Sequence, residues 1–124
     1  MNIKVLKILI ILFFIAAAFF LKSFIWWGNV LQIQNLNTIQ TISLQANNAS
    51  GSVNYLKLLI TGNIDGSVKI QRADSEKLYE EPIILKGQVN LKLRGDWYDK
   101  KCLIFYTPTN VKSGKLQIRY KFSS

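Results

Sequence analysis

The sequence predicts an all-β fold: a small antiparallel β-sandwich of about seven or eight strands, preceded by a single N-terminal transmembrane helix. Three observations lead to this prediction. A long apolar run lies at the N-terminus, and short alternating stretches separated by turn residues fill the rest of the chain. No amphipathic helical pattern lies between these stretches, which argues against parallel βαβ units. An open barrel is the second architecture that fits.

The apolar run covers residues 8–21, fourteen residues without a break. Counted over residues 5–27, the segment has 23 residues, roughly 34 Å of helix at about 1.5 Å per residue, which suits the apolar part of a bilayer. Lys22 can extend towards the lipid headgroups, and Trp26 and Trp27 suit the membrane–water interface. We therefore expect an uncleaved signal anchor.

A cleaved signal peptide, which would give a secreted protein, and a buried core helix are the alternatives for this segment. Residues 16–18, AAA, satisfy a cleavage pattern, but cleavage there leaves eight apolar residues before the site and an apolar mature N-terminus. Lys4, Lys7 and the N-terminal amine precede the span, whereas only Lys22 follows closely. The positive-inside rule then places the N-terminus in the cytoplasm and residues 28–124 outside.

Three parts are expected along the chain: the anchor (1–27), a polar stalk (28–37) and an extracytoplasmic β domain (38–124). The first strand is expected within residues 38–46. Ile39 is out of phase there with the alternating positions that follow, which favours a bulge or a later start of the strand. The next loop contains Asn48-Ala49-Ser50, an acceptor pattern for N-glycosylation.

The remaining strands are punctuated by turn residues. They are expected at 53–62, 67–73, near Leu78, 82–87, 88–94, 102–106 and 115–122. Asp65-Gly66 predicts a hairpin between the first two, and residues 107–114 are expected to be a loop. Residues 102–106, CLIFY, are apolar on both faces, which is typical of a central, covered strand. Residues 115–122 alternate, with Leu116 and every second residue after it facing the core.

The composition excludes several classes of site. The formal charge is +9, no histidine is present, and there is one cysteine. Without histidine, Ser-His-Asp and Cys-His nucleophiles are excluded, and the commonest general base and metal ligand are missing. We therefore expect no enzyme, no cofactor and no metal. The stretch NIDG, residues 63–66, resembles part of a calcium loop, but it lacks the further oxygen ligands at alternating positions and is expected to be a turn.

Residues 95–102, GDWYDKKC, combine two carboxylates, two large aromatics, two lysines and the only cysteine. One interpretation is a hairpin turn that the aspartates cap and Trp97 covers. A second is a binding patch in which an exposed Trp97-Tyr98 pair lies beside cations. A third is a histidine-independent hydrolase using Asp96 and Asp99, although their separation fixes no useful geometry. The cysteine is expected to be buried, with a reactive thiol as the alternative.

Charge is distributed unevenly along the chain. Residues 28–85 carry four basic and five acidic residues, net −1, whereas residues 86–124 carry nine and two, net +7. One explanation of the basic C-terminal part is that alternating lysines on solvated strand faces keep the protein soluble. Another is a cationic face turned towards anionic lipid headgroups, an acidic wall polymer or an acidic protein.

Together these features favour a non-enzymatic binding module of the cell envelope, anchored to the cell membrane through residues 5–27. An inhibitor or immunity-like role and an accessory subunit of a membrane complex both fit this organisation. The partner is expected to be a protein or an anionic envelope component, and not nucleic acid. The expected binding surface consists of Trp97, Tyr98, Lys92, Arg94, Lys100 and Lys101.

Overall fold

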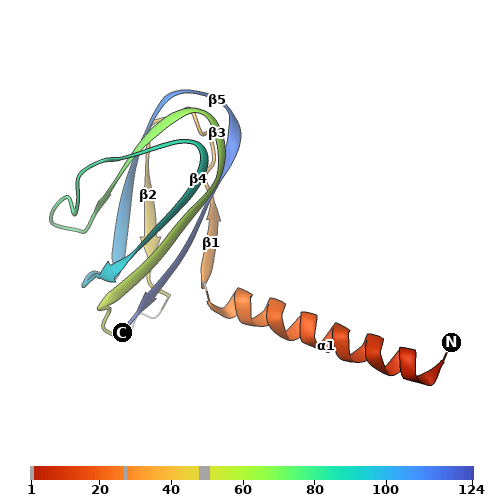
Figure 1. Cartoon of the computed structure of the whole chain (residues 1–124). Helices are drawn as coiled ribbons and strands as arrows, with labels where there is room; N and C mark the ends of the chain where they lie inside the picture. Colours follow the sequence, from red (N-terminus) through yellow and green to blue (C-terminus); the bar gives the residue numbers. More distant parts are fainter. Residues whose placement is uncertain (1, 27, 48–50) are drawn as a thin grey trace.

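The computed structural model describes residues 2–26, 28–47 and 51–124, with side chains for all of these except residues 18–26. Over this part of the chain, one helix precedes an antiparallel β domain of five strands (Figure 1). The elements are α1 (Ile3–Trp26), β1 (Asn29–Gln32), β2 (Gln40–Gln45), β3 (Tyr55–Ala73), β4 (Ile83–Asp96) and β5 (Lys101–Ser123). The predicted all-β class is confirmed.

The strands form one sheet in which β5 is central. β3 pairs with β5 along almost its whole length, and β4 pairs with the other edge of β3. Both β1 and β2 pair with β5 on its remaining edge: β2 with residues 101–106 and β1 with residues 117–120. The short strands β1 and β2 therefore occupy the same edge of β5, one beside each half.

The long strands bend, so the sheet folds back on itself and makes two layers (Figure 1). At the bend, the register of β3 against β5 shifts between Asp65 and Ser67, which pair with Ser113 and Thr109. Layer 1 contains β1 with residues 55–64, 87–96 and 114–123, and layer 2 contains β2 with residues 67–73, 83–86 and 101–109. Alternate side chains of both layers point inwards and form one core.

The bend requires glycine because backbones approach closely there. Gly114 has a φ of 132°, which side-chain-bearing residues rarely adopt, and a Cβ at this position would collide with the carbonyl oxygen of Asn63. Gly62, on the paired strand β3, has a φ of 146°, and a Cβ at this position would collide with the carbonyl oxygen of Lys115. The two glycines thus permit β3 and β5 to stay paired up to the bend.

The prediction of about seven or eight short strands is wrong, because segments expected as turns lie inside long strands. β3 continues through Asp65-Gly66, which forms a bulge and not a hairpin. The expected loop 107–114 belongs to β5, and the two stretches on either side of Gly87 form the single strand β4. Glycine favours a turn and a bend within a strand equally, so composition alone does not separate them. Near Leu78 the described chain makes a single bridge, to Ala73.

Other expectations at the start of the domain have clear outcomes. The later start of the first strand is confirmed: Ile39 is 74% exposed, whereas Ile42 and Leu44 are buried in the core. The segment expected as a stalk, residues 28–37, contributes β1 to the sheet and buries Ile33. Near the bend, this segment accepts a hydrogen bond from the Tyr106 hydroxyl at the Leu36 carbonyl, with a distance of 2.6 Å.

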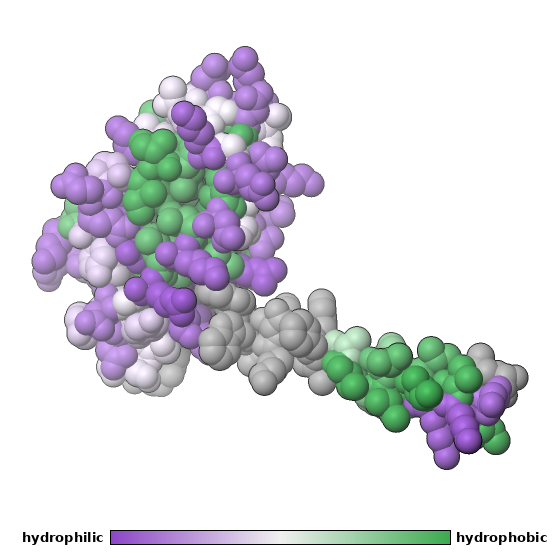
Figure 2. Space-filling model, in the orientation of Figure 1, coloured by the Kyte–Doolittle hydropathy of each residue, from purple (hydrophilic) through white to green (hydrophobic). Residues whose placement is uncertain are grey.

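The N-terminal helix that the sequence predicts is present as α1, which extends away from the β domain (Figure 1). All eleven large apolar side chains from Ile3 to Ile15 are exposed, by 47–72%. Figure 2 shows this part of the helix as mostly hydrophobic, and the visible surface of the domain as hydrophilic around a hydrophobic patch. In the described residues, no helix combines the length and apolar character needed to cross a membrane. The expected interfacial side chains Lys22, Trp26 and Trp27 lie outside the described side chains.

Gly114→Ala is expected to lower the free energy of unfolding by about 1–3 kcal/mol or more, because it adds backbone strain and a collision with β3. Gly95→Ala is the matched control, since a Cβ there meets nothing within 4 Å and the backbone φ is ordinary. That control is expected to change stability by less than about 1 kcal/mol. Urea unfolding of the full chain in detergent, followed by circular dichroism, measures both. Equal effects of the two substitutions would contradict the proposed role of the bend.

Candidate functional site

The stretch GDWYDKKC connects the two layers at the open end of the folded sheet, opposite the bend. Asp96, the last residue of β4, pairs with Tyr55 in layer 1, whereas Lys101, the first residue of β5, pairs with Gln45 in layer 2. The hairpin interpretation is therefore wrong in its topology, because β3 lies between β4 and β5 in the sheet. Residues 97–100 cross from one layer to the other and partly close the end of the core.

Trp97 closes this end from within. Its side chain is only 3% exposed and belongs to the core, while its indole Nε1 donates a hydrogen bond to the Lys101 carbonyl at 3.1 Å. Its backbone N–H donates to the Asn54 carbonyl, also at 3.1 Å. The neighbouring Tyr98 is 77% exposed. An exposed Trp97-Tyr98 pair, as the binding interpretation requires, is therefore not formed.

Arg72 is a buried cation that sequence reasoning did not single out. Its side chain lies inside layer 2, 8% exposed, and pairs with Glu80 through an Nη2–Oε2 distance of 2.7 Å. Its guanidinium carbon lies 4.8 Å from the ring centroid of Tyr79 and 5.5 Å from that of Trp97. The only signal in the sequence that Arg72 is buried was the alternation of the strand, which places Arg72 on the same inward-facing side as Val68 and Ile70. This cluster attaches the segment between β3 and β4 to the open end.

The two aspartates of the stretch lie in different surroundings. Asp99 accepts hydrogen bonds from the Ser75 hydroxyl and N–H, at 2.5 and 2.9 Å, and from the Lys101 N–H at 3.0 Å. The Ser75 hydroxyl bond in particular holds the pKa of Asp99 below its ordinary value, against the opposing effect of partial burial. A carboxylate held in this way is a poor general acid. Asp96 is exposed at the end of β4.

These segments enclose a hollow of about 850 Å³ at the open end. Leu78, Tyr79 and Tyr98 expose apolar or aromatic surface at its rim, by 54, 45 and 77%. Its charged lining residues are Asp74, Glu76, Asp96, Asp99, Lys77 and Lys100, a net charge of 2 − 4 = −2. The open end is thus locally acidic in a chain that is basic overall.

Cations gather on the outer surface of layer 1, which we call the basic face. Its members are Lys57, Lys92, Arg94, Lys115, Arg119 and Lys121. Lys57 lies directly opposite Arg94 on one neighbouring strand and Lys121 on the other. In the next row, Leu59 lies between Lys92 and Arg119. Asp96 is the only acidic residue at the described outward positions of layer 1, so the net charge is 6 − 1 = +5.

Like charges on directly opposing positions of a sheet destabilise it. Placing Lys57 opposite Arg94 and Lys121 therefore brings like charges together across the strands. A surface on which positive charge predominates suits contact with an extended anionic surface. The sequence did not predict Lys57, Lys115, Arg119 and Lys121 as part of the binding surface. Alternation along their strands indicated that they point outwards. Their proximity to one another depends on the register between β3 and β5, which a local pattern does not give.

The six residues predicted as one binding surface fall in separate places. Lys92 and Arg94 belong to the basic face, and Lys100 and Tyr98 lie on the connection at the open end. Lys101 lies on the outer side of layer 2, and Trp97 is inside the core.

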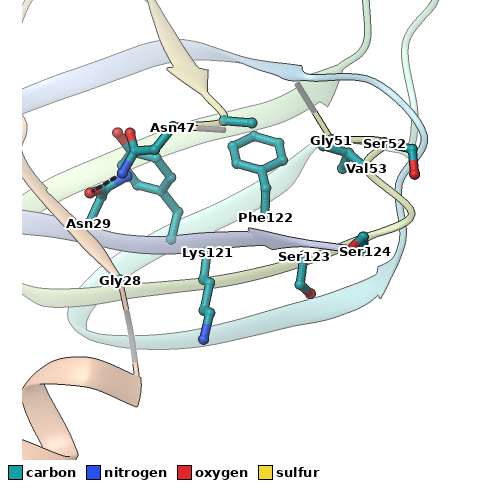
Figure 3. Close-up of a pocket in the computed structure, with 12 residues that line it drawn as sticks. Gly28, Asn29, Asn47, Gly51, Ser52, Val53, Lys121, Phe122, Ser123 and Ser124 are labelled. Carbon is teal, nitrogen blue, oxygen red and sulfur yellow. Dashed lines mark hydrogen bonds between the residues drawn. The ribbon is translucent and has the colours of Figure 1, made fainter. Parts of the chain in front are cut away.

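A second hollow, of about 370 Å³, lies beside Gly28, two residues after the end of α1 (Figure 3). The Asn47 side-chain amide donates to Asn29 Oδ1 across it at 3.0 Å, and the Phe122 ring points into it. Lys121 points to the opposite side of β5 (Figure 3). A Cβ on Gly28 would lie 3.3 Å from the Lys121 Cβ, so the basic face begins next to the helix junction. The glycosylation pattern at residues 48–50 lies outside the described residues.

Comparison with known proteins gives no match: no family model, no curated protein and no solved structure is similar to this chain. Across residues 2–26, 28–47 and 51–124, no group of three or more Cys, Asp or Glu residues could hold a metal ion. A functional assignment therefore rests on where the basic face, the open end and α1 lie.

Cys102 is fully buried, as expected, and lies in the core. Burial raises the pKa of its thiol to about 12, although the positive charge of Arg72 opposes this. The thiolate that reacts with maleimides is then almost absent at neutral pH. We expect Cys102 to remain unlabelled in the folded chain and to label fully in guanidinium chloride, as measured by mass spectrometry. Rapid labelling without denaturant would contradict the burial of this thiol.

Trp97→Ala is expected to destabilise the domain by about 3–5 kcal/mol, because it leaves a cavity at the open end. Tyr98→Ala, its neighbour and matched control, is expected to change stability by less than about 0.5 kcal/mol because its ring is exposed. Thermal and urea unfolding measure both. Similar, small effects would show that Trp97 does not close the core.

Proposed function

We propose that this chain is a non-enzymatic binding module, held at the outer side of the cytoplasmic membrane by α1, with the basic face as its binding surface. The observation that carries the proposal is the placement of this face directly beside the junction with an apolar helix. The proposal has three parts: the anchor, its orientation and the role of the domain.

The exposed side chains of α1 support the anchor. A helix that is apolar on all sides is stable in a protein core or in a membrane, and not in water. The described core is formed by strands, their connections and residues 33–36, and includes no residue of α1. Burying each large apolar side chain is worth about 1.5–3 kcal/mol, so eleven of them from Ile3 to Ile15 favour strongly a lipid environment.

The flanking charges support the orientation. Lys4 and Lys7 precede the apolar run, and only Lys22 follows it closely, so the cytoplasmic side is the N-terminal side. The β domain then lies in the envelope, where an anchor confines it to a thin layer. Confinement raises its effective concentration for other membrane or wall components without any added affinity.

The chemistry of the described residues supports binding over catalysis. The carboxylate of Asp99 is engaged by Ser75, the thiol of Cys102 is buried, and histidine is absent from the chain. Neither Asp99, whose pKa is lowered, nor Cys102, whose pKa is raised to about 12, suits the role of a general base at neutral pH. An inhibitor of an incoming protein and an accessory subunit of a membrane complex are the protein-binding roles that suit such a module.

Cysteine labelling in intact cells tests the anchor and its orientation. A membrane-impermeant maleimide is expected to label Tyr98→Cys without permeabilisation, because this position is 77% exposed on the β domain. Asn2→Cys, on the other side of α1, is expected to label only after permeabilisation. The buried Cys102 serves as the unlabelled reference. The opposite labelling pattern would invert the orientation, and recovery of the chain in the soluble or secreted fraction would overturn the anchor.

A further inference from the structure

We propose that the basic face docks on anionic lipid headgroups of the membrane that holds α1, so that the domain lies with layer 1 against the bilayer. This inference rests on the proposed anchor and specifies what the binding surface contacts first.

The connection between helix and domain is short. α1 ends at Trp26 and β1 begins at Asn29. Two residues reach at most about 7 Å, so Gly28 stays close to the membrane surface if α1 is inserted. Because Gly28 packs against Lys121, this end of the basic face stays within roughly one Debye length, about 8–10 Å, of the headgroups.

The basic face carries its cations in adjacent rows across three strands. Lys121, Lys57 and Arg94 lie side by side on β5, β3 and β4, with neighbouring strands about 4.8 Å apart. Arg119 and Lys92 follow in the next row, further from the open end. These cations are spread over three neighbouring strands, so a ligand that contacts them together must be broad and anionic. A bilayer surface rich in acidic lipids has this form.

The other surfaces of the domain are less suited to such a membrane. The hollow at the open end has a net charge of −2 and would be repelled by anionic headgroups. The outer side of layer 2 carries Lys69, Lys86 and Lys101. On β5, however, the residues on this side that follow Lys101 are Leu103 and Phe105, which are uncharged and half-buried. With layer 1 against the lipid, Tyr98 and the acidic hollow remain accessible to a partner protein.

A probe on each layer tests the docked orientation in the full chain, reconstituted in phosphatidylcholine vesicles with or without phosphatidylglycerol. Asn90→Cys lies on the outer side of layer 1, and Thr107→Cys on that of layer 2. Each carries an environment-sensitive fluorophore, with Cys102 left in place. Phosphatidylglycerol is expected to shield the Asn90 probe from an aqueous quencher and leave the Thr107 probe unchanged. High salt is expected to reverse the shielding.

Charge reversal tests which cations matter. Lys92→Glu/Arg94→Glu alters the basic face, and Lys69→Glu/Lys86→Glu makes the same change in net charge on layer 2. Each cation near an anionic surface is worth about a fivefold change in binding. The layer 1 variant is therefore expected to lower the docked-to-undocked ratio by about 25-fold or more, and the layer 2 variant by only a few-fold. Circular dichroism checks that both variants are folded.

The outcomes separate this inference from the anchor. If the chain fails to float with vesicles of either composition, the anchor of the proposed function fails. If it floats with both and the Asn90 probe is equally accessible in both, docking is overturned and the anchor stands. Equal effects of the two charge reversals also overturn docking. If inorganic phosphate or a soluble polyanion shields the probe on phosphatidylcholine vesicles as well as phosphatidylglycerol does, the face binds free anions and headgroup docking is wrong.

Discussion

The structure depends on one backbone constraint: β3 and β5 must bend together while they stay paired. Gly62 and Gly114 meet this constraint, because any side chain at either position would collide with the opposing carbonyl oxygen. Since the strands bend and continue, a single sheet supplies both layers and buries its inner face against itself. The same pairing fixes the cross-strand register that places Lys57 between Arg94 and Lys121. Core formation and the basic face therefore arise from one element of topology.

Folding a sheet in this way leaves one end of the core open, and the cluster around Arg72 partly closes it. Burying a cation has a desolvation cost, which Glu80 and the faces of Tyr79 and Trp97 offset. In the described residues, no buried side-chain nitrogen or oxygen lacks a hydrogen-bond partner. The cluster also fixes the acidic connection between β3 and β4 on this end. As a result, the two signs of charge are separated: acidic residues lie around the open end and basic residues lie along layer 1.

Local patterns in the sequence were sufficient for the class of fold and for the direction of many side chains. The alternation that predicts Leu116 and Ile118 as inward-facing is confirmed, because strand period is a local property. Non-local features could not be predicted in this way. Whether Gly66 makes a hairpin or a bulge depends on the strand that pairs beside it, and Trp97 is buried because its connection crosses between layers. The candidate surface was divided for the same reason: Lys92 and Lys101 are near in sequence but lie on opposite outer sides of the domain.

The account joins these features into a domain that lies flat beside its anchor, and the thickness of the protein layer on a bilayer tests this most directly. Neutron reflectometry of the full chain in a supported bilayer containing phosphatidylglycerol measures that thickness. The two packed layers of the sheet with their side chains have a thickness of roughly 20–25 Å, whereas the ten residues 55–64 of β3 alone extend about 33 Å when upright. We expect the thinner layer, and its thickening when salt is raised. A layer of strand length at every salt concentration and lipid composition would contradict the account.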